Sequence, residues 1–299
     1  MKGIRIALAQ ICPVPGDAGT NAEKIKAYMK EAADGGAELV IFPECSLTGY
    51  APERASELAL SIGAGPDGAA ELALSIRDAT DGAQKQAPGI GGGPISAIEE
   101  AAEKLGISVC FGFMEKFGDK VYISQELYCG GERTIYRKTH PGSREALYFE
   151  AGNEFPVSRG PVDCGMQLCW ESHIPEISAE YRKQGTQLLL FPYASGMSGE
   201  RCKENWQVHL PARASDNGCF AAACNLLTKD NIDLRGGGLA VWDPKGRIIA
   251  QYFGTEETLI TAEIGGELPR ERFLKEQQGI AEHDMHALSY FDLKRKELF

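Results

Sequence analysis

The sequence contains no long apolar run. None of its hydrophobic stretches approaches the roughly 20 residues that a membrane-spanning helix needs, although 43% of the 299 residues are hydrophobic. Its first residues, MKGIRIALAQ, enter an alternating strand pattern at once, without the longer apolar stretch and small-residue cleavage site of a secretory signal peptide. We therefore expect a soluble, cytoplasmic protein that has no membrane partner.

Positive charge is also scarce. The chain carries 31 Lys and Arg against 42 Asp and Glu, which gives a net charge of -11. Apart from a short KRKEL cluster near the end, the basic residues are scattered, whereas nucleic-acid-binding proteins gather theirs in a patch or stripe. This composition argues against a nucleic-acid partner.

The cysteines lack the spacing of a zinc site or of a disulfide framework. There are nine of them, an odd number, and no two have CxxC spacing. Cys110, Cys219 and Cys224 lie inside apolar runs, where cysteine behaves as a small hydrophobic residue. The pattern is typical of a reducing compartment, and we expect neither a metal nor another cofactor.

Short apolar or alternating runs recur along the whole chain and predict β-strands. The runs are IRIALAQI, ELVIFP, ISVCFGFM, VYISQELY, RTIYRK, GMQLC, QLLLFP, CFAAAC, GLAVWD, GRIIAQYF and TLITAEI. Two of the connections, YCGGER at residues 128–133 and DPKGR at residues 243–247, are typical of tight hairpins. Because other runs are separated by helical segments, we expect an α/β protein with mixed sheets.

Four helices are predicted between these strands. Thr20 to Glu23 and Ser96 to Glu99 both fit a capping box, in which two side chains satisfy free backbone N–H groups. Pro175 suits the first turn of a helix that runs to about Gly185, and a further helix is predicted over residues 204–217.

No internal repeat or linker divides the chain, which favours one domain. Residues 63–94 are rich in Gly and Ala and end in APGIGGGP, which indicates an excursion around a short helix; it is either a surface insertion or a loop over a site. After Gly266 the sequence is polar and weakly patterned, and we interpret it as a tail.

Three strands each deliver one reactive side chain near their C-terminal ends: LVIFP leads to Glu44, TIYR to Lys138 and GMQL to Cys169. In α/β sheets this edge is where ligands bind. If the strands are neighbours, a carboxylate, an ammonium group and a thiol converge there. Each residue also has an ordinary structural interpretation. Glu44 could cap a helix or form a salt bridge on the rim, Lys138 could be an edge-strand lysine, and Cys169 could be a buried structural thiol.

Such a trio can carry out covalent catalysis without a histidine. A carboxylate whose pKa is raised by burial can take the thiol proton and later give it to a leaving nitrogen. The ammonium favours the thiolate and stabilises the oxyanion of a tetrahedral intermediate. The backbone N–H of Trp170 is a candidate for the second oxyanion donor.

Several separated motifs together resemble the nitrilase superfamily of carbon–nitrogen hydrolases. They are FPE at residues 42–44 followed by TGY, then YRKTH, then LCWES, then ARASDNGCFAAACN and GGGLAVWDPKGRIIAQ. The resemblance covers roughly residues 3 to 265. It implies a four-layered α-β-β-α sandwich with two mixed sheets, a carbon–nitrogen hydrolase domain over residues 1–265, and a tail over residues 266–299 packed on that domain or on a partner subunit.

The resemblance also implies roles for individual residues. Glu44 is expected to be the general base, Lys138 the oxyanion-stabilising lysine and Cys169 the nucleophile. The segment REALYFEAG is similar to a family segment that supplies a second glutamate, which places that role on Glu145 rather than on Glu150.

Other residues are candidates for the walls of the substrate site. His140 shares a face with Lys138 if the strand continues that far. Trp170 directly follows Cys169, and the strand LLLFP is followed by Tyr193, Ala194 and Ser195. Tyr50 and Trp206 are further candidates, with core packing as their alternative.

His173, four residues after Cys169, suggests a Cys-His dyad, which the matched motif does not need. Cys164, Cys169 and His173 lack an evident fourth metal ligand. We interpret Glu171 as a rim or helix-start charge.

We expect a hydrolase that acts on a non-peptide carbon–nitrogen bond of a small amide or N-carbamoyl compound, through a cysteine thioester and with release of ammonia. CWE is similar to nitrilases, in which Asn usually follows where this chain has Ser172, so hydrolysis of a nitrile is the alternative. A non-catalytic relative that binds a small molecule or a partner protein is the alternative from another class. Family members commonly pair through helices beside the cysteine, so we expect a homodimer or a larger even assembly with residues 175–184 at an interface.

Overall fold

The computed structural model describes residues 3–62, 93–229 and 234–265. Nearly all of the predicted excursion at residues 63–94, and the whole predicted tail at residues 266–299, lie outside these described residues.

The first large sheet has the strand order β14-β1-β2-β4-β5-β6, with β3 paired to β4. Strands β1, β2 and β4 are mutually parallel, while β14, β5 and β6 pair with their neighbours in antiparallel register, so the sheet is mixed. Its strands are β1 (Ile4–Gln10), β2 (Leu39–Ile41), β3 (Leu60–Ser61), β4 (Ser108–Phe117), β5 (Lys120–Cys129), β6 (Glu132–Arg137) and β14 (Thr258–Ile264).

The second large sheet has the order β13-β12-β9-β8-β7 and is also mixed, because β7, β8 and β9 are parallel while β12 and β13 are antiparallel. Its strands are β7 (Cys164–Met166), β8 (Leu188–Tyr193), β9 (Phe220–Asn225), β12 (Leu239–Trp242) and β13 (Ile248–Tyr252). Strands β10 (Leu227–Lys229) and β11 (Leu234–Gly236) form a separate hairpin.

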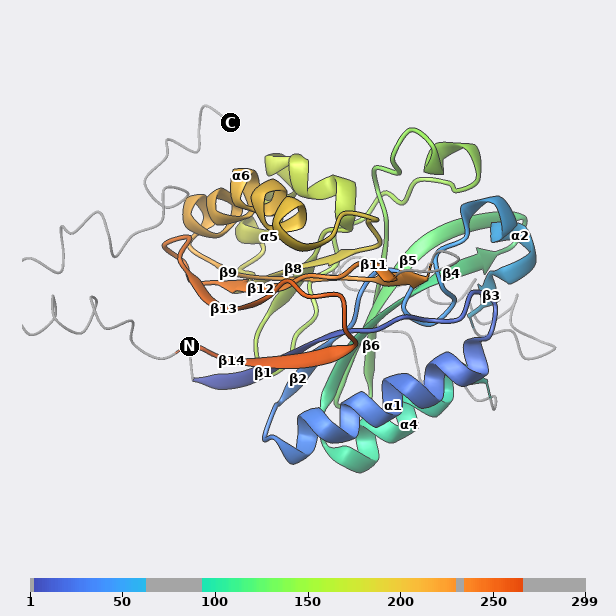
Figure 1. Cartoon of the computed structure of the whole chain (residues 1–299), viewed down its shortest axis with the longest axis horizontal. Helices are drawn as coiled ribbons and strands as arrows, with labels where there is room; N and C mark the ends of the chain where they lie inside the picture. The colour runs from blue at the N-terminus through green and yellow to red at the C-terminus, as the bar shows by residue number, and fades with distance from the viewer. Residues whose placement is uncertain (1–2, 63–92, 230–233, 266–299) are drawn as a thin grey trace, which may run out of the picture.

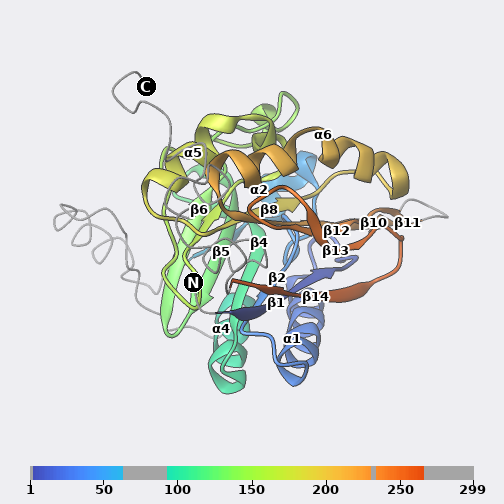
Figure 2. The same cartoon turned by 90° about the vertical axis from the view of Figure 1, so that its left-hand side faces the viewer.

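Helices cover the outer face of each sheet, as Figures 1 and 2 show. α1 (Ala18–Asp34) and α4 (Pro94–Leu105) lie on the first sheet, and α5 (Pro175–Lys183) and α6 (Gly199–Asn217) lie on the second. Three buried apolar clusters separate the four layers: one between the sheets and one under each helix pair. The shorter helical segments are the 3-10 turns η1 (Pro52–Arg54), η2 (Glu145–Leu147) and η3 (Cys169–His173), and α2 (Ala55–Leu58).

The predicted α-β-β-α sandwich is confirmed, and so is each predicted strand. The hairpin at residues 128–133 has its two-residue loop at Gly130 and Gly131, both with positive φ (57° and 84°), which glycine adopts without steric cost. No helix in the described part of the chain has the length and apolar character needed to span a bilayer.

The predicted helix starts are wrong in three places. α1 begins before Thr20, and its cap is Asp17, whose carboxylate accepts a hydrogen bond from the Thr20 N–H. α4 begins at Pro94, which suits a first helical turn because proline has no N–H to satisfy. α6 begins at Gly199 rather than at residue 204, and it continues through Pro211.

Candidate active site

Glu44 lies in a tight turn that follows β2. The turn packs directly on β4, where a Cβ atom added to Gly112 would lie only 2.5 Å from the Cys45 nitrogen, so no larger residue fits there. Leu47 N–H donates to the Gly112 carbonyl (2.8 Å) and Gly112 N–H donates to Ser46 Oγ (3.0 Å). These contacts hold the turn on β4, and the Glu44 side chain is fully buried.

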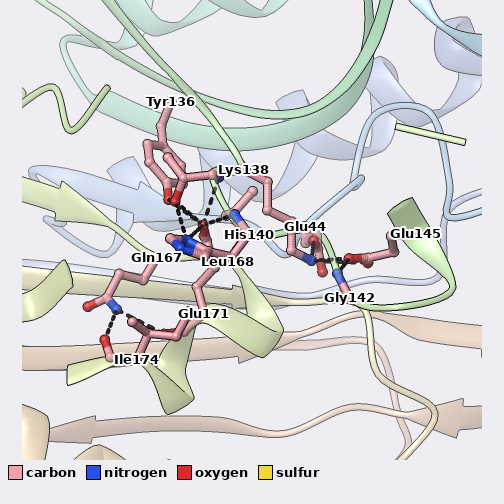
Figure 3. Close-up of polar contacts among 11 residues, drawn as sticks. Glu44, Tyr136, Lys138, His140, Gly142, Glu145, Gln167, Leu168, Glu171 and Ile174 are labelled. Carbon is pink, nitrogen blue, oxygen red and sulfur yellow. Dashed lines mark hydrogen bonds and ion pairs between the residues drawn. The ribbon is translucent and has the colours of Figure 1, made fainter. Parts of the chain in front are cut away.

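Lys138 is the first residue after β6 and is also fully buried. Its backbone is held on both sides: its N–H donates to the Ile123 carbonyl (2.8 Å) and its carbonyl accepts from Gly152 N–H (2.9 Å). Its ammonium group lies 2.8 Å from Glu44 Oε1 and 2.8 Å from Glu145 Oε2, and so bridges the two carboxylates (Figure 3).

Glu145 belongs to the 3-10 turn η2 and completes this group. Its Oε2 accepts a hydrogen bond from Gly142 N–H (2.7 Å), and its Oε1 accepts one from the Tyr50 hydroxyl (3.0 Å). The Lys138 ammonium therefore has one partner from the β2 turn and one from the η2 turn.

Cys169 opens η3, three residues beyond the end of β7, and is half-buried. Its φ is 48°, in the left-handed region that non-glycine residues rarely adopt. Among the described non-glycine residues, Cys45 (φ 55°) is the other with positive φ, and it follows Glu44 directly. Strained backbone of this kind costs about 1–3 kcal/mol per residue and clusters at functional sites.

The three strands that lead to Glu44, Lys138 and Cys169 are not neighbours, so the condition stated from the sequence is not met. β2 and β6 belong to the first sheet and are separated by β4 and β5, whereas β7 is the edge strand of the second sheet. The residues converge because the two sheets face each other. The electrostatic influence of Glu44, Lys138 and Glu145 on the Cys169 thiol reflects this proximity.

The burial of the group shifts its titration. Burial raises the pKa of Glu44 to about 7; Lys138 acts against this rise and the Glu145 charge adds to it. Burial opposes the charge of Lys138, but Glu44, the thiol and Glu145 raise the pKa of that ammonium well above its ordinary value. Burial also opposes the charge of Glu145, yet Lys138, Gly142 and Tyr50 together lower its pKa.

The surroundings of the Cys169 thiol disfavour its ionised form. Burial and the negative charges of Glu44 and Glu145 raise the pKa of Cys169 to about 12, although Lys138 and a backbone hydrogen bond from Ala194 act in the opposite direction. A nucleophilic Cys169 therefore needs a base at the moment of attack. Glu44 Oε2 is buried and has no hydrogen-bond partner, so this oxygen is free to accept a proton.

Three of the predicted wall residues lie around this group in different ways. Tyr50 is half-buried and contacts Glu145 through its hydroxyl. Trp170 is 53% exposed, with its ring 5.0 Å from that of His173. His140 is exposed, and because β6 ends at Arg137, strand alternation does not relate it to Lys138.

The other three predicted wall residues follow one another at the end of β8. Tyr193 is buried, and its hydroxyl donates to Ser172 Oγ (2.7 Å). Ala194 hydrogen-bonds the Cys169 thiol through its backbone. Ser195 is held by Asn225, whose Oδ1 accepts from Ser195 N–H (2.8 Å) and whose Nδ2 donates to its carbonyl (3.0 Å).

Trp206 is fully buried in the cluster under α5 and α6, which supports the core-packing alternative. His173 is exposed and its ring lies 4.2 Å from that of His209. Within the described ranges, no group of three or more His, Cys, Asp or Glu side chains could hold a metal ion.

The sequence predicts Glu171 as a rim or helix-start charge, and its place at the start of η3 fits the second of these, but its contacts with the Lys138 segment and the role of Asn225 were missed. Glu171 is fully buried rather than on a rim, and it accepts hydrogen bonds from both the Lys138 segment and the Cys169 turn. Asn225 ends β9 and organises the loop after β8. For Asn225 a signal was available, because it closes the matched segment ARASDNGCFAAACN.

A four-layered sandwich in which a lysine is held between two buried carboxylates beside a strained cysteine is suited to acyl transfer through sulfur. The chain belongs to the carbon-nitrogen hydrolase family, whose model matches residues 5–270. The resemblance predicted from the motifs is thereby confirmed, and the protein is a carbon–nitrogen hydrolase.

Nitrilases are among the relatives that the chain matches in sequence, and an amidase shares its fold. The chain is 28% identical to an aliphatic nitrilase of Sinorhizobium fredii (strain HH103), across 91% of this chain and 90% of that protein. It is 25% identical to nitrilase 1 of Arabidopsis thaliana, across 92% and 83%. A mutant of the Nesterenkonia AN1 amidase, from the nitrilase superfamily, shares the fold with a TM-score of 0.71 at 22% identity, covering 99% of this chain and 95% of that one.

Proposed function

We propose that this enzyme hydrolyses a small amide or N-carbamoyl compound through a cysteine thioester and releases ammonia. Glu44 is the general base, Lys138 the oxyanion-stabilising lysine, Cys169 the nucleophile and Glu145 the second glutamate. The observation that carries the proposal is the Lys138 ammonium, 2.8 Å from each of two buried carboxylates and within electrostatic range of the thiol.

In the first half-reaction Glu44 removes the thiol proton while sulfur attacks the carbonyl carbon. The ionised form of Glu44 is available near neutral pH, and its unpartnered Oε2 is the acceptor. The carbonyl oxygen becomes an oxyanion, stabilised by the Lys138 ammonium and the Trp170 backbone N–H. Glu44 then gives the proton to the leaving nitrogen, the carbon–nitrogen bond breaks, and ammonia and a Cys169 thioester remain.

In the second half-reaction Glu44 acts again as a base. It takes a proton from a water molecule, whose oxygen attacks the thioester carbon, and the same two donors stabilise the oxyanion. When the carbon–sulfur bond breaks, the sulfur recovers the proton from Glu44. The products are a carboxylic acid, or a carbamic acid from an N-carbamoyl compound, and the free enzyme.

A nitrile is the second candidate substrate, because the curated relatives with which the chain aligns over about nine-tenths of its length include nitrilases. The same sulfur would add to the nitrile carbon, and the Glu44 proton would pass to the nitrogen to give a thioimidate. Water then adds, ammonia leaves, and the identical thioester is hydrolysed. The two substrates therefore share every protein group named above.

Selection between substrates depends on the walls of the site. We propose that Trp170, His140, Tyr193, Ala194, Ser195 and Tyr50 contact the substrate. Ala194 and Tyr50 have the strongest support, because the former hydrogen-bonds the thiol and the latter contacts Glu145.

A substrate panel tests the proposed function. Ammonia release is measured with small amides, N-carbamoyl amino acids and aliphatic nitriles, and the acyl-enzyme is sought by mass spectrometry after acid quenching. We expect turnover of an amide or N-carbamoyl compound and an adduct on the peptide that contains Cys169. Turnover of nitriles alone would select the second candidate, and inactivity on every compound would contradict the proposal.

The pH dependence of kcat/KM should follow the ionisation of Glu44. Since the base must be ionised, kcat/KM should fall below the pKa of about 7, to roughly a tenth of its plateau at pH 6. Glu145→Gln removes a negative charge that raises this pKa, so the variant should retain a larger fraction of its own plateau at pH 6. A limb that moves to higher pH would contradict the assignment.

We also propose a homodimer or a larger even assembly of a cytoplasmic protein with one hydrolase domain over residues 1–265. All nine cysteines lie in the described residues and none of them forms a disulfide, which supports a reducing compartment. Pro175, Glu176 and Lys183 of α5 are exposed and available to a second copy. Native mass spectrometry at micromolar concentration should therefore show an even oligomer, and a purely monomeric spectrum would contradict this.

A further inference from the structure

Glu171 lies two residues after Cys169 and is fully buried, yet the proposed chemistry gives it no role. Its carboxylate is surrounded by hydroxyl and backbone N–H donors from two different parts of the chain. One part is the end of β6 and the segment after it, which carries Lys138; the other is the turn after β7, which carries Cys169.

Oε1 of Glu171 accepts four hydrogen bonds from the segment around Lys138. The Tyr136 hydroxyl donates at 2.6 Å, Thr139 N–H at 2.8 Å, Thr139 Oγ1 at 2.6 Å and His140 N–H at 3.0 Å. These donors lie on both sides of Lys138 in the sequence. Figure 3 shows Tyr136 and His140 directed toward the Glu171 carboxylate.

Oε2 of Glu171 accepts a hydrogen bond from Leu168 N–H (2.8 Å), the residue immediately before Cys169. A glutamate at the start of a helical turn commonly accepts such a bond, and that bond alone would be ordinary capping. The four donors on the other oxygen come from β6 and the residues directly after it, and they have no part in capping η3.

The Cys169 turn needs this support. Its φ of 48° persists only where the surrounding structure over-determines it. Gln167 Nε2 stabilises the later part of the turn by donating to the Glu171 carbonyl (3.1 Å) and the Ile174 carbonyl (3.3 Å). Glu171 accepts a hydrogen bond from Leu168 N–H at the start of the turn, and through its other oxygen it joins the turn to the segment around Lys138.

We propose that Glu171 is a positioning residue that sets the placement of the Lys138 ammonium relative to the Cys169 sulfur. It acts through the Tyr136, Thr139, His140 and Leu168 donors and makes no contact with substrate. The inference rests on the proposed function, in which the ammonium stabilises the oxyanion formed by that sulfur. A displacement of about 1 Å between such groups can cost on the order of 100-fold in rate.

Glu171→Gln tests this inference. The glutamine amide has nearly the same shape, but one of its two ends is a donor that faces other donors, so it cannot hold both segments. We expect kcat to fall about 10- to 100-fold, with KM changed less than about threefold because Glu171 itself does not contact the substrate.

The matched control is Glu99→Gln. Glu99 is also a buried carboxylate with strong donors, since it accepts two hydrogen bonds from the buried Arg133, but it lies on α4 outside the first sheet. The control should lose stability through a broken buried pair and keep kcat within about twofold of the wild type. Melting temperatures of both variants separate stability from positioning.

Alkylation of Cys169 by iodoacetamide, followed by mass spectrometry, provides a readout that needs no substrate. Glu171→Gln should slow this reaction at least about tenfold, and Glu99→Gln should leave it unchanged. If the wild type is inert on every substrate but Glu171→Gln still slows alkylation, the proposed function fails and the positioning role stands.

Two results would overturn the inference: kcat values for the two folded variants within threefold of each other, or equal alkylation rates. If Glu171→Gln does not fold, the double variant Tyr136→Phe, Thr139→Val replaces it, because it removes two donors and keeps the carboxylate. Its kcat should fall about tenfold, and an unchanged kcat and alkylation rate would equally overturn the inference.

Discussion

Replacement of Cys169 by alanine is expected to abolish ammonia release, with kcat/KM reduced by about 10⁴-fold or more. Without the sulfur no thioester can form. Glu44 also loses the attacking thiol from which it would remove a proton. Cys169→Ser should be almost as inactive, because a serine hydroxyl is far harder to deprotonate than a thiol by a carboxyl group whose pKa is about 7. The measurement is the initial rate on the best substrate of the panel, together with a search for the acyl adduct.

Cys129→Ala is the matched control for this prediction. Cys129 is likewise a half-buried free cysteine, but it ends β5 at the Gly130-Gly131 hairpin. Its replacement should leave the rate within about twofold, as expected of a site remote from the chemistry. A Cys169→Ala enzyme that still releases ammonia at a tenth of the wild-type rate would remove the sulfur from the mechanism.

The strands could be predicted from the sequence because strand positions that are buried are occupied by apolar residues. LLLFP and CFAAAC are apolar throughout, and the corresponding β8 and β9 are buried along their whole length between two layers. The first residues of the helices are harder to predict from the sequence. Thr20 to Glu23 has the letters of a capping box, but Asp17 takes the cap, because several nearby polar residues can satisfy the same N–H groups.

The candidate site was predictable to the extent that strand ends deliver side chains to one region. Glu44, Lys138 and Cys169 were singled out for this reason, although the sheets meet face to face instead of placing the three strands side by side. Glu145 followed from the resemblance alone, because nothing in its spacing marks a residue of a 3-10 turn as a partner of Lys138.

Glu171 shows what a single sequence cannot reveal. Its partners are mostly backbone N–H groups of Thr139, His140 and Leu168, and every residue except proline has such a group. The positive φ of Cys45 and Cys169 is equally hidden, because cysteine has no preference that announces a left-handed conformation. Both features depend on contacts between segments that are far apart in the sequence.

Replacement of Lys138 by alanine is expected to reduce kcat by about 10²- to 10³-fold or more, the usual effect of removing an oxyanion donor. It also leaves Glu44 and Glu145 buried together without their shared cation. Breaking a buried pair in this way costs about 3–5 kcal/mol of unfolding free energy. Because the remaining carboxyl groups then have higher pKa values in the folded than in the unfolded state, this loss should be smaller at pH 5 than at pH 8.

His173→Ala is the counterpart that separates the two mechanisms. The exposed His173 ring packs on Trp170 and His209, and its removal should keep kcat within about threefold, as for a surface contact outside the reacting group. In a Cys-His dyad the results would be reversed: His173→Ala would be inactive, and Lys138→Ala would retain turnover once its stability was restored at low pH. Rates measured for both variants at pH 6 and pH 8, below their melting temperatures, decide between a carboxylate base and an imidazole base.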